Sequence, residues 1–440
     1  MFRSFGLKRI APLPCLFAAI VFIGSCGGSS KPKAPGASGL VARRVVASQS
    51  VSSPTASAGL VIINGDNDTV AHAAEINAGI SPGLMTMSPD RSVLLAFDSV
   101  ANGVNIINTS KETSSGSITL PGPTISMVAT TPTSGYAAVP SAPFNTGPPP
   151  GAVIAMNLAS ATILATISVP NAQYVVASPT GSPLLAFSNE SDSLTVISQP
   201  NVNTGNVVTT TVSGFDRPIW AVFSTDGSTA YVLNCGPECG SASATASVQT
   251  LDMSTLAVGA HVPVDGATIG WLSGSTLYVA GTPTASVSNS HPNNSCAGQA
   301  TAAKICGRLD TIDVGTMMVT GSAVITDGYH DRIDMSVNSQ LFVGSYNCTN
   351  IGDVNNPIGE VRGCLSIFNT TNGAVVIPPD NGDVTGFQSL TTQYVEYVAE
   401  GGNLRVYNTQ IDSLLITNYI EAGTIVVPGQ VIDVKAIDFF

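Results

Sequence analysis

The chain has 440 residues, of which 44% are apolar and only 10% are charged, and it contains 43 glycines and 28 prolines. This composition suits many short strands joined by turns and disfavours long amphipathic helices. The formal net charge of −12 argues against nucleic acid as a partner, because neutralising phosphate requires lysine and arginine.

The first 25 residues are predicted to be an export signal. Met1–Ile10 is basic, and Ala11–Ile23 is an apolar run of signal-peptide length that is too short for a comfortable transmembrane helix. The run ends Phe22-Ile23-Gly24-Ser25-Cys26, which resembles the bacterial lipoprotein signal, in which an aliphatic residue and two small residues precede a lipidated cysteine. The alternative is an ordinary secretory signal followed by a cysteine of no special role.

The lipoprotein resemblance implies that the mature chain begins at Cys26 and is anchored to a membrane by lipid on that thiol. Gly27 stands where an aspartate would indicate retention in the inner membrane, so we expect an outer-membrane lipoprotein that faces the periplasm or the cell surface. Residues 26–43 have no apolar period and are predicted to form a flexible tether. The remainder, 44–440, is predicted to be one domain.

An apolar alternation that ends in Asn, Asp or Ser recurs along this domain. Eight copies follow one another at intervals of 39 to 61 residues: 60–64, 104–108, 153–157, 194–198, 248–252, 309–313, 365–369 and 404–408. Six further short apolar runs precede copies of this segment, at 93–97, 183–187, 230–234, 276–280, 340–344 and 394–400. Repeats of this length with four strands each are typical of a β-propeller. We therefore predict an all-β fold of four-stranded antiparallel blades.

The clearest repeat is Arg217–Gly266, whose first two strands flank the turn Ser224-Thr225-Asp226-Gly227. In that turn Gly227 can adopt positive φ and Asp226 can bond the backbone locally. Related turns occur at Ser88-Pro89-Asp90-Arg91, which lacks the glycine, and at Ser178-Pro179-Thr180-Gly181. Together with Ala230-Tyr231-Val232-Leu233-Asn234, this pattern resembles the YVTN repeat of bacterial and archaeal surface propellers over about residues 60–440. The resemblance implies the fold and leaves the function open.

The number of blades follows from the two ends of the repeat region. Seven complete units run from Pro82 to about Gly423, whereas 42–79 supplies only a second, third and fourth strand and 430–440 supplies one strand. Pairing these ends would complete an eighth blade and close the ring without exposed edges. We predict eight blades, with seven as the alternative because the family more often has that number.

Six cysteines remain beyond the signal region, and each consecutive pair falls between the second and third strands of a blade. An even count in an exported protein predicts the disulfides Cys235–Cys239, Cys296–Cys306 and Cys348–Cys364. A metal site is the alternative, but no histidine stands at ligand spacing, and we expect no metal and no cofactor. The loops at 282–305 and 349–363 are candidates for a recognition surface, or else decoration.

Propeller ligands usually bind where the connections between blades converge at one end of the central channel. Most of these connections are small and neutral here, but Asp216-Arg217 and Asp331-Arg332 occupy the same register in two blades. One hypothesis is a polar site in which the two arginines bind an anionic group and a histidine acts as acid or base. The other is that each Asp–Arg pair ties its connection to the next blade. The candidate residues are Asp216, Arg217, Trp220, Asp265, His330, Asp331 and Arg332.

Motifs of catalysis are sparse in the sequence, which contains no Gly-x-Ser-x-Gly elbow, no phosphate-binding glycine loop and no His-Glu-x-x-His segment. We therefore expect a monomeric, non-enzymatic, lipid-anchored propeller that serves as a binding or assembly scaffold for a protein, peptide or glycan. The alternatives are a hydrolase of the propeller lactonase type, with its site at the channel mouth, and a structural protein of the cell envelope.

Overall fold

The computed structural model describes most of the chain beyond its N-terminal segment. The described residues are 41, 43–50, 59–71, 76–143, 150–198, 207–243, 245–284, 306–348, 363–378, 382–409, 421–425, 427 and 429–438. Two compact units can be separated, Met1–Pro35 and Gly36–Phe440, and every described residue belongs to the second. The predicted signal peptide, Cys26 and nearly all of the tether lie outside the described residues, as does most of the two predicted recognition loops.

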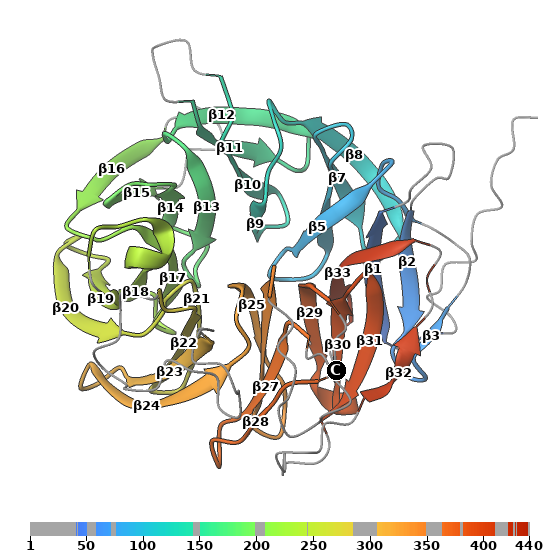
Figure 1. Ribbon diagram of the computed structural model, residues 1–440. Coiled ribbons are helices and arrows are strands. Elements are labelled where there is room, and N and C mark those ends of the chain that lie inside the picture. Colours follow the sequence, from blue (N-terminus) through green and yellow to red (C-terminus); the bar gives the residue numbers. More distant parts are fainter. Residues whose placement is uncertain are drawn as a thin grey trace, which may run out of the picture. The chain divides into compact units, whose positions relative to one another are not determined.

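Eight antiparallel sheets make up the described part of the chain, and they surround one axis as a β-propeller (Figure 1). The prediction of an all-β, eight-bladed propeller is confirmed, and the seven-bladed alternative is wrong. Blade one contains β5 (Pro82–Met87), β6 (Val93–Asp98), β7 (Gly103–Asn108) and β8 (Thr113–Thr119), and blade two contains β9 (Ser126–Thr131), β10 (Ser134–Val139), β11 (Ala152–Asn157) and β12 (Thr162–Ser168). Blade three contains β13 (Ala172–Ala177), β14 (Leu184–Ser188), β15 (Ser193–Ser198) and β16 (Val208–Ser213), and blade four contains β17 (Pro218–Phe223), β18 (Thr229–Asn234), β19 (Ala246–Asp252) and β20 (Val258–Val264).

Blades five to seven contain β21 (Ile269–Ser273), β22 (Thr276–Gly281), β23 (Gly307–Asp313) and β24 (Met318–Ile325); β25 (Tyr329–Met335), β26 (Gln340–Tyr346), β27 (Leu365–Asn369) and β28 (Val375–Val376); and β29 (Val384–Leu390), β30 (Val395–Glu400), β31 (Asn403–Asn408) and β32 (Glu421–Ile425). Blade eight joins the two ends of the domain and contains β33 (Gln430–Ala436), β1 (Arg44–Ser50), β2 (Gly59–Asn64), β3 (Thr69–Val70) and β4 (Ile76–Asn77). Strand β33 pairs with β1, β1 pairs with β2, and β2 pairs with both β3 and β4. The described helical segments are two short 3-10 turns, η2 (Gly236–Cys239) and η3 (Thr391–Gln393).

The predicted strands correspond closely to the observed ones. All eight predicted third strands are strands: β2, β7, β11, β15, β19, β23, β27 and β31. The six predicted second strands are also confirmed, as β6, β14, β18, β22, β26 and β30. The second strand of blade two, β10, follows a turn without the serine-proline-aspartate signature and is not among the strands that the sequence predicts.

The turns between first and second strands form as their sequences predict. Gly227 has a φ of 72°, its N–H donates to the Ser224 carbonyl at 2.9 Å, and the Ser224 hydroxyl donates to Asp226 at 2.7 Å. Arg91 holds the equivalent left-handed position with a φ of 58°, although it is not glycine. Its guanidinium donates to the Ala436 carbonyl at 2.7 Å, so this unusual turn residue also ties blade one to β33.

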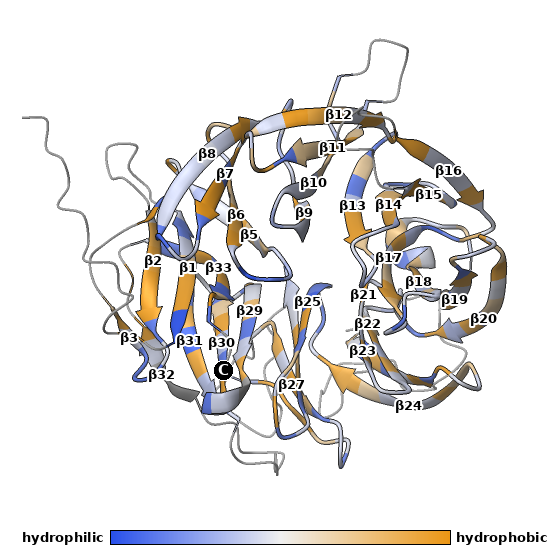
Figure 2. Ribbon diagram, turned by 180° about the vertical axis from the view of Figure 1, so that it is seen from behind, coloured by the Kyte–Doolittle hydropathy of each residue, from blue (hydrophilic) through white to orange (hydrophobic). Residues whose placement is uncertain are grey.

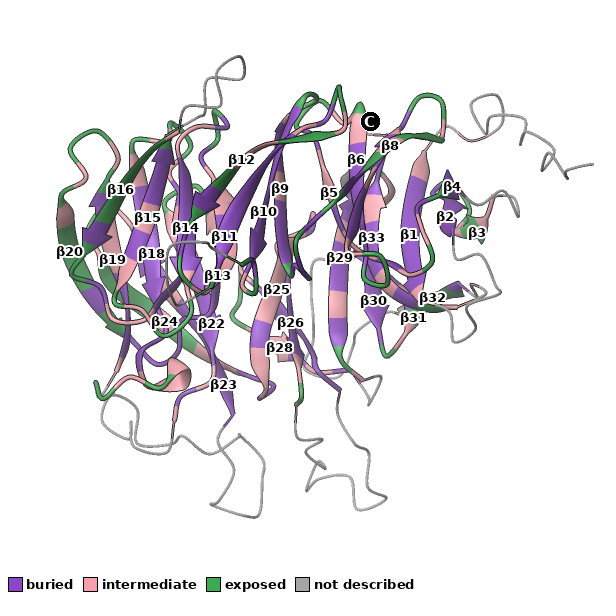
Figure 3. Ribbon diagram, turned by 90° about the horizontal axis from the view of Figure 1, so that it is seen from above, coloured by how far each residue is buried: buried purple, intermediate pink, exposed green. Residues whose placement is uncertain are grey.

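The core lies between neighbouring blades rather than within any one of them. A representative cluster joins Phe97 and Ile106 of blade one to Val139 and Ile154 of blade two, all of them buried. Strands β2 and β7 are accordingly largely hydrophobic, whereas the fourth strand β8 is mostly pale in Figure 2. Figure 3 shows the same difference in burial: β22, a second strand, is mostly buried, whereas β20, a fourth strand, is mostly exposed. Each blade therefore needs its neighbours to bury both faces.

The ring closes by pairing the ends of the domain, as the sequence predicts. Strand β1 pairs antiparallel with β33, with Val45 opposite Ala436 and Val46 opposite Lys435. The guanidinium of Arg44 donates from Nε and Nη2 to the two carboxylate oxygens of Asp438, both at 2.8 Å. This bidentate pair fastens the first described strand to the last.

Two of the predicted disulfides are present, which confirms these pairings. Cys235 bonds Cys239 beside η2, and Cys348 bonds Cys364 between β26 and β27. Cys296, the predicted partner of Cys306, lies outside the described residues.

Candidate functional site

The predicted channel-mouth residues do not form one common site. Because strands alternate in direction, the connections between blades and the connections between second and third strands lie at the same end of the ring. The seven candidates all belong to this end of blades four to six. Trp220, Asp331 and Arg332 lie near Tyr174 of blade three. Arg217 lines a small cavity together with the same tyrosine.

Arg332 is held by its own connection and by the next blade. Its Nη1 donates to the Asp331 carboxylate at 2.9 Å, and its Nε donates to the Thr385 carbonyl of blade seven at 2.8 Å. Two of its donor groups are thus engaged within the protein, which matches the interpretation of a tie between blades. Burial raises the pKa of Asp331, and the adjacent guanidinium partly offsets that shift.

Arg217 occupies a different niche, between blades three and four. It has a φ of 55°, and its Nε lies 3.8 Å from the carboxylate of Asp192 in the preceding blade. A small cavity of about 10 Å³ separates it from Tyr174 and the Cys235–Cys239 disulfide. That volume suffices for roughly one water molecule. The Arg217 and Arg332 guanidinium groups therefore serve different contacts.

Asp216 and Asp265 are used within their own loops and blades. The Asp216 carboxylate accepts from the Ser241 hydroxyl at 2.6 Å. Asp265 is buried, and one of its carboxylate oxygens lies 3.8 Å from the Nε of the equally buried Arg308. The Asp265 backbone N–H donates to the Asp310 carboxylate at 2.8 Å, which holds this connection against β23 of blade five.

His330 is placed in the interface between blades and away from solvent. Its side chain has no exposed surface, and its Nε2 lies 3.0 Å from the Thr326 carbonyl. Burial lowers the pKa of the imidazole to about 4. The sequence hypothesis places an acid–base histidine at the channel mouth. In the structure the His330 ring is fully buried, away from a ligand at the mouth.

A set of phenols and carboxyls takes the place of the predicted histidine site. We call it the mouth cluster, and it consists of Tyr174, Glu238, Tyr329, Asp331, Arg332 and Tyr346. Tyr174 is the third residue of β13 in blade three, whereas Tyr329 begins β25 in blade six, and the two phenols interact. These blades are not neighbours, so the two side chains meet across the channel.

Aromatic packing holds the cluster in place. The Tyr329 and Tyr346 ring centroids are 5.2 Å apart, and Tyr174 packs edge-on against Trp220 at 5.8 Å. Burial raises the pKa of Tyr174 to about 12, with a further contribution from the charge of Asp331. Burial likewise raises the pKa values of Tyr329 and Tyr346, so all three phenols keep their protons at physiological pH.

Glu238 is a titratable group of the cluster whose pKa is brought close to physiological pH. It lies on η2, inside the loop closed by the Cys235–Cys239 disulfide, and its Oε2 accepts from the Thr282 backbone N–H at 3.0 Å. Burial raises the pKa of this carboxyl to about 8, and the single backbone hydrogen bond opposes that shift only in part. At neutral pH Glu238 is therefore mainly a carboxylic acid that can donate a hydrogen bond.

The mouth cluster consequently contains three phenolic hydroxyls, the protonated carboxyl of Glu238, and the Asp331 carboxyl paired with the Arg332 guanidinium. Such a set is suited to neutral ligands that carry hydroxyl, carbonyl or amide groups. Sequence patterns missed Glu238 and the tyrosines. Two signals were available: Tyr329 is two residues before the predicted Asp331, and Glu238 is the charged residue within the shortest cysteine loop.

No group of three or more His, Cys, Asp or Glu side chains in the described part of the chain is arranged to hold a metal ion. Within these residues no helix has the length and apolar character needed to cross a membrane.

Similarity to a solved structure supports the propeller fold. The chain is similar in structure to the dihydro-heme d1 dehydrogenase NirN, with a TM-score of 0.58 and 12% identity over 90% of this chain and 75% of that one. A periplasmic gluconolactonase of Pseudomonas aeruginosa, PpgL, matches with a TM-score of 0.49 and 11% identity over 90% and 99% of the two chains. No family model and no curated protein match the sequence. At such identities the similarity concerns the fold alone, and the protein is an eight-bladed β-propeller.

Proposed function

We propose that this protein is a non-enzymatic binding scaffold of the YVTN-repeat type. It is exported, anchored through lipid on Cys26 and held on the outside of a bacterial membrane by the 26–43 tether, with the propeller as its recognition domain. This proposal is supported by the lipoprotein-like segment Ile23-Gly24-Ser25-Cys26 and by the repeat pattern of the domain. Its partner is a peptide segment, a protein or a glycan.

The observation that carries the binding proposal is the meeting of Tyr174 and Tyr329 across the channel. A contact between blades three positions apart is not required to pack neighbouring blades together. The cluster also combines rigid aromatic area with hydrogen-bonding tips, a combination that binding surfaces favour because tyrosine loses little conformational entropy on binding. The mouth cluster is therefore our candidate for the ligand site.

The binding proposal can be tested with a defined panel of short uncharged peptides and neutral oligosaccharides, measured by calorimetry against the full-length mature protein. We expect at least one class to bind, and Tyr329→Phe to weaken that binding about tenfold through loss of one hydroxyl. Tyr394→Phe is the matched control, because Tyr394 is exposed far from the cluster. Equal affinity in the wild type and both variants would remove the mouth cluster from the proposal.

One observation favours a second candidate, a hydrolase of the lactonase type. A carboxyl with a pKa of about 8 can act as a general acid near neutral pH, and Glu238 has this property. Turnover of γ- or δ-lactones that disappears in Glu238→Gln would favour the hydrolase. If no lactone is hydrolysed, with or without added divalent metal ions, the hydrolase is excluded and the proposal of a binding scaffold is kept.

The anchoring proposal requires its own experiment. Cells that express the full chain are labelled with radioactive palmitate, and a Cys26→Ala variant provides the control. We expect label in the wild type only, together with release of the variant from the membrane fraction. Label in both proteins, or in neither, contradicts lipidation at Cys26.

A further inference from the structure

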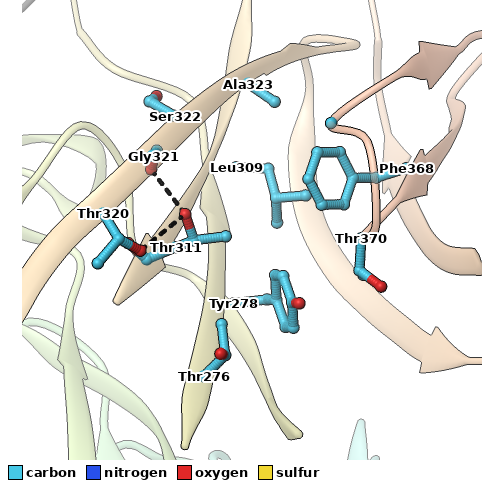
Figure 4. A pocket seen from close by; sticks show the side chains of 11 residues that line it. Thr276, Tyr278, Leu309, Thr311, Thr320, Gly321, Ser322, Ala323, Phe368 and Thr370 are labelled. Carbon is cyan, nitrogen blue, oxygen red and sulfur yellow. Dashed lines mark hydrogen bonds between the residues drawn. The ribbon is translucent and has the colours of Figure 1, made fainter. Parts of the chain in front are cut away.

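A second recess lies on the outer rim of the ring, between blades five and six (Figure 4). It has a volume of about 330 Å³ and is lined from three strands of blade five and from the β27–β28 turn of blade six. Its lining residues are Thr276, Tyr278, Leu309, Thr311, Thr320, Gly321, Ser322, Ala323, Phe368, Thr370 and Gly373. This recess, which we call the rim pocket, is independent of the mouth cluster.

The rim pocket lies beside the turn that joins β27 to β28. Strand β28 has two residues, whereas β24 of the preceding blade has eight. Beyond Val376 the chain still follows β27, because the Gly363 N–H donates to the Pro378 carbonyl at 3.1 Å. At the other end of β28, Phe368, Thr370 and Gly373 border the pocket against the strands of blade five. The rings of Tyr278 and Phe368 pack edge-on with centroids 6.1 Å apart and form the floor.

The walls of the pocket consist mainly of hydroxyl groups. The Thr311 hydroxyl donates to the Gly321 carbonyl at 3.1 Å, and the Thr320 hydroxyl donates to the Thr311 carbonyl at 3.2 Å. Figure 4 shows these side chains on the same wall. Their protons are directed to the backbone, and the Thr320 hydroxyl also lies 3.4 Å from the Thr311 hydroxyl oxygen, so each oxygen keeps at least one lone pair for a ligand that donates. Gly321 permits this arrangement, because a Cβ there would lie 2.8 Å from the Thr311 hydroxyl.

The lining excludes several classes of ligand. It contains no lysine, arginine or histidine to bind phosphate or carboxylate, and no carboxylate or thiolate to bind a metal ion. An apolar side chain of a peptide would cover the remaining lone pairs of the threonine and serine oxygens without supplying a donor, which is costly. A neutral ring that carries several hydroxyl groups satisfies both the aromatic floor and the accepting walls. We propose that the rim pocket binds one neutral sugar unit of a glycan.

The volume agrees with a single sugar unit. Small-molecule pockets span about 300–1,000 Å³, and this one is at the lower end. A single ring in a shallow, wet site is expected to bind weakly, with a Kd on the order of 1 mM. Useful affinity in the cell would then come from several contacts along one glycan.

The test uses saturation-transfer NMR on the full-length mature protein with a panel of neutral hexoses and N-acetylhexosamines. Uronic acids and sugar phosphates serve as charged comparators. We expect signals from at least one neutral sugar and at least tenfold weaker binding of its charged counterpart. Absence of binding by every neutral sugar, or equal binding of the charged forms, would overturn the proposal.

Two variants locate the site. Ser322→Trp fills the pocket and should abolish the signal, and Thr311→Val should weaken binding about tenfold by removing one acceptor. The control is Ser117→Trp in blade one. Ser117 follows Gly116 in the fourth strand β8, as Ser322 follows Gly321 in the fourth strand β24, and the two serines have the same register against their third strands. Thermal melting verifies that each variant is folded. Sugar signals that persist in Ser322→Trp, or that disappear equally in Ser117→Trp, would also overturn the proposal.

Discussion

Glu238 and Glu396 are both carboxyl groups whose pKa is raised by burial, but their surroundings give them different roles. Glu238 belongs to the mouth cluster, and burial raises its pKa to about 8. Glu396 is fully buried on β30, and the neighbouring charge of Asp334 raises its pKa further. The first group is positioned to sense a ligand, whereas the second affects the stability of the fold.

Replacement of Glu238 by glutamine should remove the pH dependence of ligand binding. In the wild type, affinity for the panel member that binds best should fall as the pH passes through about 8, because the donor proton is lost. Glutamine keeps a donor at every pH, so its profile should be flat from about pH 6 to pH 9. Calorimetric titrations at several pH values measure both profiles. Identical profiles for the two proteins would contradict a role for the Glu238 proton.

Replacement of Glu396 by glutamine should raise stability at alkaline pH. The folded-state pKa lies above the value of 4.5 for an unperturbed glutamate, so the folded protein holds a proton that the unfolded chain releases. The stabilisation is complete below about pH 4.5 and decreases as the pH rises toward the folded pKa, by at most about 1.4 kcal/mol per pH unit. Urea unfolding between about pH 5 and pH 8 should show a shallower loss in Glu396→Gln. The exposed Glu190→Gln should leave the wild-type slope unchanged.

At the scale of the element, strand positions could be predicted far better than the functional surface. Apolar alternation and the serine-aspartate turns depend on neighbouring residues, so LTVIS at 194–198 and the Gly227 turn were both identified from the sequence. Contacts between distant blades leave no local pattern. Nothing near Tyr174 indicates that Tyr329 lies across the channel, and nothing near Thr311 indicates that β28 is short. The burial of His330 was missed for the same reason.

The Cys348–Cys364 disulfide should stabilise its blade more than the Cys235–Cys239 disulfide does. The bonds span 16 and 4 residues, and loop-closure entropy predicts losses of about 3 and about 2 kcal/mol when each pair is replaced by alanine. Chemical unfolding of the two double-alanine variants measures the difference. The reverse order would show that loop length does not govern their contribution.

At the scale of the whole molecule, the propeller depends on one junction between the chain ends. Closure by β1 and β33 leaves the ring without a free inner edge, and every inner strand contacts two others. The interfaces between blades are therefore coupled, so a fault at the junction affects the ring as a unit.

Arg44→Ala should destabilise the ring by about 3 kcal/mol, because it leaves Asp438 partly buried without its bidentate partner. Arg44→Lys should rescue only part of this loss, since lysine cannot form the paired contact. The adjacent Arg43→Ala is the control, because Arg43 pairs with Asp66 in a more exposed position and its loss should cost less than about 1 kcal/mol. Equal effects at Arg43 and Arg44 in thermal unfolding would contradict this view of closure.

The central claim is that ligands bind at the mouth cluster. Tyrosine-selective carbon-13 NMR tests it most directly, because the chain has ten tyrosines and the two proposed sites contain different ones. A peptide or oligosaccharide that binds at the channel should shift the resonances of Tyr174, Tyr329 and Tyr346, whereas a simple sugar in the rim pocket should shift Tyr278. If such a peptide or oligosaccharide binds one site per protein and shifts none of the three mouth tyrosines, the claim is contradicted.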